Sequence, residues 1–308
     1  MRCFYNRKKI EEADLEKINK NVGLYWVHCS ETNIKELKLV SKKFNIPLKL
    51  LKNSLDRNES PRIDKFDDYY YVVFRAPVQD NEFIGTTPVG FIITEKGVIT
   101  ITIDKLDSID NFHNEQELKA LMQTDSISIF IRQLLAMTMM YSEFLENVGM
   151  SVDEIEEKAF KKNSGDITED IFHARKILLY LKKAFSENIK VIEALKKEQT
   201  KNKLRANLLD EAYIEMKQLI DVEEIYRGRI ISIIEIFKSN ISNRLNEVMK
   251  QFTVITALLL LPAVISGMYG MNLILPLQQN RYAFWIVLVI MLIGMLIMYR
   301  FFKARKWV

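Results

Sequence analysis

The stretch that decides the fold runs from Asn246 to Asn272, NEVMKQFTVITALLLLPAVISGMYGMN, where a charged helical pattern passes into an apolar run. The run ends at Gly270-Met271-Asn272. Residues 252 to 269 carry no charge, and their number is about what a helix needs to cross the hydrocarbon core of a bilayer. Between Gln251 and Tyr299 the only charged residue is Arg281. The sequence therefore predicts a membrane span that follows a soluble region.

A second apolar run covers residues 283 to 298. Basic residues precede the first run and follow the second: Lys238, Arg244 and Lys250, then Arg300, Lys303, Arg305 and Lys306. The positive-inside rule places both flanks on the cytoplasmic side of the plasma (inner) membrane. We therefore expect two spans, two cytoplasmic termini and a short outer loop over residues 272 to 281.

Composition excludes several classes of function. The net charge is only +4, and the basic residues alternate with acidic ones, which is not a nucleic-acid footprint. The chain has no Walker-type phosphate loop, so we expect no ATP. Its three histidines and two cysteines have no metal-ligand spacing, and no nucleophile motif is present. An enzyme is not expected.

The region before the spans divides in two. Residues 1 to 124 read as an α/β domain, because β-branched and aromatic runs alternate with amphipathic stretches. The predicted strands cover residues 24 to 28, 69 to 74, 89 to 94 and 98 to 103, with a hairpin turn at 95 to 97. One predicted helix begins after a cap at Ser30 or Thr32 and ends at Phe44. A second runs from Pro47 to Leu55.

Long helices follow, because no proline occurs between Pro88 and Pro262. Residues 125 to 162 and 167 to 199 predict a helical hairpin over 125 to 202, with breaks at 163 to 166 and 200 to 202. From residue 203 the periodicity continues to 267, which is roughly 100 Å of helix at ~1.5 Å per residue. Its apolar stripe needs partners from the hairpin or from other subunits.

The predicted fold class is thus an α+β membrane protein with an N-terminal α/β cytoplasmic domain, a long helical hairpin and two transmembrane helices. The very long helix divides into a stalk over residues 203 to 250 and a first span over 251 to 271. The second transmembrane helix covers 282 to 302. A basic tail over 303 to 308 completes the chain.

The end of the first span also carries a resemblance to a known family. Tyr269-Gly270-Met271-Asn272 at one end, Asn246 to Lys250 at the other and Lys303 to Trp307 near the terminus resemble the CorA family of magnesium transporters. The stretch from Pro61 to Pro77 resembles the cytoplasmic segment of that family. The resemblance spans nearly the whole chain.

The resemblance implies a homopentameric funnel in the lipid bilayer, with the long helices around a pore and a Gly-Met-Asn selectivity ring at its outer mouth. Members carry Mg²⁺ inward, and often Co²⁺ or Ni²⁺. The ungapped match implies a pore lined by Asn246, Met249, Phe252, Thr256, Leu260 and Ala263. Their spacing of three and four residues independently agrees with one helical face.

The family's chemistry suits these residues. Asn272 amides would hydrogen-bond the waters of a hydrated Mg²⁺, which dehydrates reluctantly, and the apolar lining suits a gate that closes by dewetting. The resemblance also implies inhibition by cytoplasmic Mg²⁺ bound to acids between subunits. Glu211 with Asp210 beside it, and Glu235, fall at matching places, as do Asp221 and Glu224.

Other interpretations stay open. The apolar residues also fit a lipid-facing or helix-packing surface, and the acids also fit a solvated helix. The loop after Asn272 has Pro276 but lacks the acid that the family usually carries there, and Ala263 stands where a hydroxyl is frequent. The alternatives are a Co²⁺, Ni²⁺ or Zn²⁺ transporter of the same family, including one for efflux, and a non-conducting membrane-anchored sensor or scaffold.

Overall fold

The chain forms two compact units, Met1–Ile233 and Ile234–Val308. The computed structural model describes residues 1–6, 10–12, 15, 18, 23–79, 84–106, 109, 124–160, 167–198, 202–272, 274–277 and 279–307. Helix α7 (Lys203–Tyr269) has residues in both units. Each unit is described by itself.

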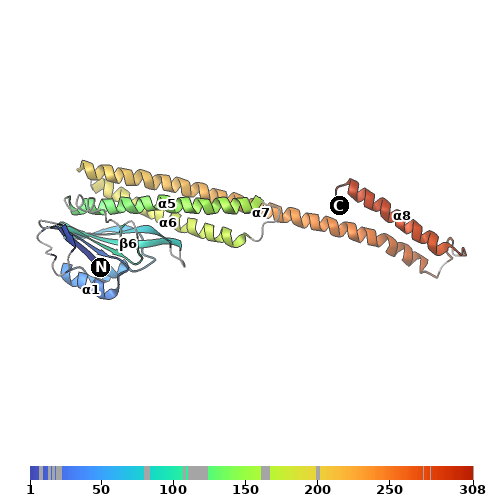
Figure 1. Ribbon diagram of the computed structural model, residues 1–308, viewed down its shortest axis with the longest axis horizontal. Coiled ribbons are helices and arrows are strands. Elements are labelled where there is room, and N and C mark those ends of the chain that lie inside the picture. Colours follow the sequence, from blue (N-terminus) through green and yellow to red (C-terminus); the bar gives the residue numbers. More distant parts are fainter. Residues whose placement is uncertain are drawn as a thin grey trace. The chain divides into compact units, whose positions relative to one another are not determined.

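The first unit is built on a seven-stranded sheet with the order β2-β1-β3-β7-β6-β5-β4 (Figure 1). Only β3 and β7 are parallel neighbours, and the other neighbouring pairs are antiparallel. The strands are β1 (Arg2–Asn6), β2 (Ile10–Glu12), β3 (Leu24–Cys29), β4 (Arg62–Lys65), β5 (Tyr69–Gln79), β6 (Ile84–Thr94) and β7 (Gly97–Thr102). The four predicted strands are confirmed as β3, β5, β6 and β7, and the other three were not predicted.

The predicted hairpin turn is confirmed between β6 and β7. Thr94 pairs with Gly97, so Glu95 and Lys96 form a two-residue turn. Glycine is needed at position 97, because a Cβ atom there would lie 2.2 Å from the ring of Tyr25. The Tyr25 hydroxyl in turn lies 2.7 Å from Thr94 Oγ1, which fixes the hairpin to β3.

Two short helices cover one face of the sheet, α1 (Ile34–Phe44) and α2 (Leu48–Asn53). The prediction of Ser30 or Thr32 as the cap of α1 was wrong. Asn33 is the N-cap, and its side-chain oxygen accepts from the backbone N–H groups of Lys35 and Glu36 at 2.9 and 3.1 Å. Thr32 instead donates its hydroxyl proton to the Glu36 carboxylate. Helix α2 starts after Pro47 as predicted and ends two residues before Leu55.

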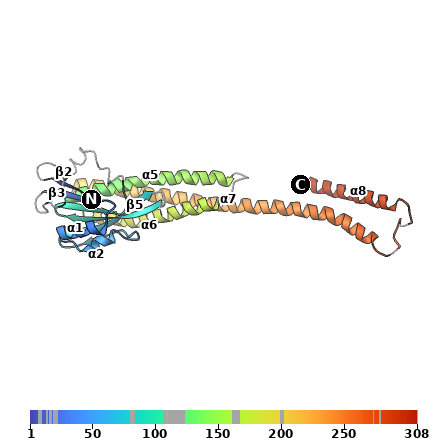
Figure 2. The ribbon, with the colours of Figure 1, turned by 60° about the horizontal axis from the view of Figure 1, so that its bottom comes forward.

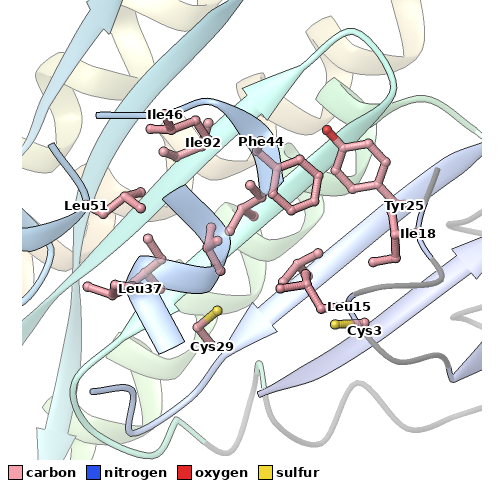
Figure 3. Close-up of a cluster of buried hydrophobic side chains, with 14 of the residues drawn as sticks. Cys3, Leu15, Ile18, Tyr25, Cys29, Leu37, Phe44, Ile46, Leu51 and Ile92 are labelled. Atoms are coloured by element: carbon pink, nitrogen blue, oxygen red, sulfur yellow. The ribbon is translucent and has the colours of Figure 1, made fainter. Parts of the chain in front are cut away.

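Between these helices and the sheet lies a hydrophobic core in which Leu37 and Leu51 meet Ile92 (Figure 3). Cys3 and Cys29 are part of it, both buried and both free thiols. Burial raises the pKa of the Cys29 thiol to about 12, with smaller contributions from Glu36 and Cys3. A thiol held protonated in this way is unreactive, so Cys29 acts as a small apolar side chain, and Cys3 is buried in the same core.

Helices α5 (Ser126–Phe160) and α6 (Thr168–Glu198) cover the other face of the sheet, giving three layers (Figure 2). Phe130 packs edge-on against Phe91 at 5.0 Å between ring centroids. Asn188 of α6 accepts from the backbone N–H of Arg75 and donates to its carbonyl, both at 2.9 Å. These helices confirm the predicted hairpin. The breaks predicted at 163 to 166 and 200 to 202 lie outside the described residues, except Asn202.

Within the first unit, α7 lies parallel to α5 and is tied to it by polar contacts. Arg205 pairs with Asp125, the residue before α5, at 2.8 Å, and Glu215 lies 2.5 Å from Ser142. Arg229 pairs with Asp153 at 2.6 Å and also with Glu156. Between the contacts of Glu215 and Arg229, a Cβ at Gly149 would fall 2.3 Å from the Tyr226 hydroxyl, so the two helices approach closely there. The hairpin thus supplies one partner for the stripe of the long helix.

The second unit consists of the remainder of α7 and helix α8 (Ala283–Ala304). Both helices are long and apolar enough to cross a membrane, since each contains an 18-residue stretch with a mean hydropathy of 2.0 in α7 and 2.3 in α8. Helix α7 ends at Tyr269, two residues beyond residue 267, where the predicted periodicity ends, and two residues before residue 271, where the predicted span ends. Helix α8 ends two residues beyond residue 302.

Candidate ion pathway

The Gly-Met-Asn motif directly follows the last residue of α7. The Gly270 N–H donates to the Ser266 carbonyl at 2.9 Å, and the Met271 N–H donates to the Met268 carbonyl at 3.2 Å. Helical winding therefore continues through Met271, and Asn272 is the first residue after it. The side chains of Met271 and Asn272 are exposed. A side-chain amide with free oxygen and nitrogen atoms thus stands at the end of the helix.

The six residues predicted to line a pore are all exposed in the single chain. They are Asn246, Met249, Phe252, Thr256, Leu260 and Ala263. Phe252 is 63% exposed and Leu260 is 59% exposed. Large apolar side chains seldom remain this exposed along an ordered helix without a partner, so this face is available to lipid or to another protein surface.

The opposite face of α7 packs against α8. Val254 is buried, and a Cβ atom at Gly294 of α8 would lie 2.7 Å from Leu261 Cδ2. At about 100° per residue, Val254, Leu258 and Leu261 fall within about 60° of one another on α7. Phe252, Thr256 and Ala263 fall within about 40° of one another, centred about 180° away. Three of the six predicted lining residues therefore lie on the side of α7 away from α8. Asn246, Met249 and Leu260 fall up to about 100° from the centre of these three, and Ile255 and Leu259 are exposed as well.

Pro262 interrupts the hydrogen bonding of α7 within this segment. Because proline has no N–H, the carbonyl of Leu258 loses its helical partner. One turn later the Ser266 hydroxyl donates to the Pro262 carbonyl, and lower down the Thr253 hydroxyl donates to the Met249 carbonyl at 2.8 Å. Hydroxyl groups that bond back to the preceding turn favour local bending, as does the hydrogen bond missing at Pro262.

The loop after the motif is held against the end of α7. The Tyr269 hydroxyl donates to the Pro276 carbonyl at 3.3 Å, and Leu277 adopts a left-handed backbone with φ of 71°. The Asn280 N–H then donates to the Leu277 carbonyl at 2.9 Å. Leu273 and Gln278 lie outside the described residues. Tyr269 therefore limits how far Asn272 can move from the helix end.

The acids predicted to bind regulatory metal are spread along α7 in the first and second units. Asp210 forms an ion pair with Lys196 of α6 at 2.6 Å. Glu211 and Glu235 are exposed, as are Asp221 and Glu224. No group of three or more potential metal ligands occurs among the described residues of the chain. The single chain does not bring these acids together.

The family profile of the CorA-like Mg²⁺ transporter protein matches residues 21–304. The chain is 30% identical to the cobalt/magnesium transport protein CorA of Methanocaldococcus jannaschii over 307 residues, which cover 97% of this chain and 96% of that one.

The chain belongs to the CorA family.

Further comparisons agree with this. The Thermotoga maritima cobalt/magnesium transport protein CorA is 22% identical over 87% of this chain and 78% of its own. The complete structure of the CorA magnesium transporter from M. jannaschii superposes with a TM-score of 0.88 at 27% identity and covers 100% of this chain and 98% of its own. The predicted fold class is thereby confirmed. CorA is a family of membrane transporters and not of enzymes.

Sequence reasoning missed one buried carboxylate on the CorA stalk helix. Glu223 is 2% exposed and faces Arg227 Nε at 3.5 Å. Burial raises its pKa, while the charges of Arg227 and Lys182 act in the opposite direction. The spacing of Glu223 and Arg227 is that of an ordinary surface pair on a helix, so the sequence contained no signal that this pair turns inward.

Proposed function

We propose that this CorA protein is a homopentameric channel that imports Mg²⁺ down its electrochemical gradient. The observation that carries the proposal is the exposed face of α7, which is opposite the face that packs on α8 and leads to Asn272. Five copies of α7 that turn this face inward would enclose a pore and bury the exposed Phe252 and Leu260. The five α8 helices would then face the lipid.

At the outer mouth, Gly270, Met271 and Asn272 form the selectivity ring. Mg²⁺ holds its water tightly and prefers a strict octahedron of oxygen atoms. A ring of neutral Asn272 amides hydrogen-bonds those waters without binding the bare ion too strongly to release it. The contact from Tyr269 to Pro276 keeps the ring at the helix end. Because the outer loop contains Arg281 and no acid, the amides rather than a carboxylate attract the ion.

Below the ring, the pore is mostly apolar. From the outer to the inner end, the proposed lining consists of Ala263, Leu260, Thr256, Phe252, Met249 and Asn246. A narrow apolar constriction closes by losing its water, so small rotations of α7 gate the current. The irregular segment around Pro262 is the part of the helix best suited to such rotations.

The membrane potential supplies the driving force. Two charges that cross 100 mV gain about 4.6 kcal/mol, at ~2.3 kcal/mol per charge. No ATP is required. The charge distribution supports a plasma (inner) membrane location with both termini in the cytoplasm, since the basic residues flank the spans on one side only.

Cytoplasmic Mg²⁺ bound between subunits closes the channel. Of the three acids predicted for this role, Asp210 is paired within its own chain with Lys196. Glu211 and Glu235 are exposed and have no ion pair among the described residues, which leaves them available to a metal shared with a neighbouring subunit. Loss of that metal would leave like charges facing one another and separate the subunits.

The decisive experiment is ion flux into proteoliposomes that contain a Mg²⁺-sensitive dye, under an inside-negative potential. Asn272→Ala should abolish the entry that the wild-type protein shows. Gln279→Ala, which removes an exposed amide from the same loop, should retain it. Absence of entry for the wild-type protein as well as for both variants would contradict transport and favour a non-conducting sensor or scaffold.

Two further measurements test the assembly and its regulation. Light scattering in mild detergent should give the mass of a pentamer, and a monomer would contradict the pore. Glu211→Lys should shift inhibition by internal Mg²⁺ to higher concentration, whereas Glu193→Lys, which changes an exposed acid of α6, should shift it less. Equal inhibition curves for the wild type and Glu211→Lys would exclude Glu211 from the regulatory site.

A second candidate cargo is Co²⁺, because both relatives named above are cobalt/magnesium transport proteins. Ni²⁺ and Zn²⁺ are tested in the same way. Flux of each ion in the same proteoliposomes, with Mg²⁺ as competitor, ranks the cargoes. Reversal of the gradient and potential measures outward movement, and faster outward than inward flux at matched driving force would favour efflux.

A further inference from the structure

The C-terminal end of α8 is closed by a specific backbone turn. The Lys306 N–H donates to the Lys303 carbonyl at 3.0 Å, and the Trp307 N–H donates to the Phe302 carbonyl at 3.1 Å. Lys306 lies between them in the left-handed region with φ of 56°. Two such hydrogen bonds around a left-handed residue define a Schellman motif. The turn folds the last residues back over the helix end.

Aromatic contacts accompany the turn. The Trp307 indole stacks on the Phe302 ring with 5.6 Å between centroids and 25° between planes. The guanidinium of Arg305 lies 5.4 Å from the centroid of the Phe301 ring. The left-handed position of this motif is usually glycine, because any side chain is strained there. Here it is a lysine, so the turn keeps a charged side chain at a strained position.

Positive charge is concentrated around the turn and is not neutralised within the chain. Arg300, Lys303, Arg305 and Lys306 are all exposed, and none of them has an ion pair among the described residues. The last acid in the sequence is Glu247. Tyr299 and Phe301 are also partly exposed beside these cations. The end of α8 is therefore a compact surface of cations interleaved with aromatic rings.

We propose that this surface, residues 299 to 307, binds the phosphate groups of anionic phospholipids and anchors the second span at the membrane surface. A span that ends at Ala304 places the turn at the level of the headgroups. Tryptophan and tyrosine favour that layer, since their rings tolerate both hydrocarbon and water. Lysine and arginine side chains next to a span bind anionic headgroups.

The chemistry favours lipid over an acidic segment of a second copy. An acidic segment in water would need only the cations for binding. This turn also stacks Trp307 on Phe302 and leaves Tyr299 and Phe301 exposed. Aromatic rings beside cations suit an interface that is apolar on one side and charged on the other. The proposal rests on α8 crossing the membrane and is independent of ion transport.

Fluorescence quenching by brominated lipids tests the proposal on the full chain in liposomes. Brominated phosphatidylglycerol should quench the tryptophan emission more than the same fraction of brominated phosphatidylcholine, and the preference should decrease with salt. Lys303→Gln/Arg305→Gln/Lys306→Gln should remove it, at about fivefold per charge. Arg175→Gln/Lys176→Gln/Lys183→Gln, which neutralises the same residue types on α6, should preserve it.

A pair of variants at one position separates charge from the folded turn. Lys306→Gly and Lys306→Val both lose one charge, but only glycine adopts the left-handed backbone without strain. Lys306→Gly should lower the preference about fivefold, and Lys306→Val should lower it further because Trp307 is released. Equal preference in the two variants would exclude the folded turn from the site.

Two results would overturn the proposal. One is a preference for phosphatidylglycerol that survives the triple substitution of the tail. The other is equal quenching of the wild-type protein by brominated phosphatidylglycerol and brominated phosphatidylcholine, since the tail would then have no preference for an anionic headgroup. Neither measurement depends on flux, so a protein that conducts no Mg²⁺ still gives a clear answer.

Discussion

The two compact units differ in where their apolar side chains find partners. In Met1–Ile233, many large side chains, such as those of Trp26 and Phe91, are at most 2% exposed. In Ile234–Val308, only Val254 and Val287 among the described residues are buried. The first unit completes its core within one chain, whereas the second leaves most of its apolar side chains exposed in the single chain. In the proposed pentamer, those side chains would contact lipid and further copies of the chain.

The largest effect on stability is expected for truncation of a core residue of the first unit. Phe91→Ala should lower the free energy of unfolding by about 3–5 kcal/mol, because Phe91 is fully buried against Phe130 and its removal leaves a cavity. Denaturant unfolding of the detergent-solubilised protein, followed by far-UV circular dichroism, measures the change.

Phe252→Ala is the matched control in the second unit. Phe252 is 63% exposed in one chain, so its truncation should change the unfolding of the first unit by less than about 0.5 kcal/mol. We expect it to alter ion flux instead. If both phenylalanine variants destabilise the protein equally, the contrast between the units does not hold.

The next largest effect is expected at the contact between α7 and α8 within the second unit. Gly294→Val should lower the thermal stability of the spans by about 1–3 kcal/mol, because a Cβ at position 294 would lie 2.7 Å from Leu261 Cδ2. The added Leu261→Ala should restore part of the loss. Thermal melting in detergent at fixed protein concentration measures both.

Gly228→Val provides a comparison for this test, since a Cβ at Gly228 meets nothing within 4 Å. Because valine has a higher helix propensity than glycine, this variant should not destabilise the helix. A double variant no more stable than Gly294→Val would indicate that Leu261 is not the residue that limits the approach of α7 and α8.

Much of the contrast between the two units could be predicted from the sequence, because it follows from the periodicity of apolar residues and the distribution of charge. The apolar run from 252 to 269, without a charge, predicts a span whatever its neighbours are. The hairpin and long helix follow from the absence of proline between Pro88 and Pro262. The resemblance at Gly270-Met271-Asn272 then predicted the family, and the comparisons confirm it.

The remainder depended on contacts between distant residues. Strand β4 (Arg62–Lys65) is charged and short, so only its pairing with β5 reveals it. The cap of α1 was misassigned because Ser30, Thr32 and Asn33 are all suitable residues, and the backbone decides among them. The contact between Tyr269 and Pro276 joins a hydroxyl to a carbonyl, and such a pair has no sequence pattern.

A third, smaller effect is expected at the junction of the stalk with α5. Arg229→Gln should lower the free energy of unfolding by about 0.5–1 kcal/mol, since its ion pairs with Asp153 and Glu156 are partly exposed and screened. Added salt should reduce the difference from the wild type. Denaturant unfolding at low and high salt measures it, with the exposed Arg132→Gln as the control. A difference that salt does not change would indicate lost packing of the arginine stem rather than lost charge.

The smallest effect is a dependence of stability on pH that comes from Glu223. Burial raises the pKa of this carboxyl in the folded chain, so the folded state binds a proton more readily than the unfolded state. Stability therefore falls as pH rises from about 4.3, the ordinary glutamate value, through the raised pKa. Glu223→Gln removes this loss of stability at high pH. The variant should therefore be more stable than the wild type at pH 8, and the difference in stability should vanish below pH ~4.

Urea unfolding at a series of pH values measures this difference, and Asp221→Asn is the control because its side chain is exposed on the same helix. That variant should show no comparable trend. If Glu223→Gln is instead less stable than the wild type by the same amount at every pH, attraction to Arg227 outweighs the burial of the carboxylate. The stalk would then gain stability from the Glu223–Arg227 charge pair. Its inner face would thus be stabilised partly by charge, whereas the core of the sheet is apolar.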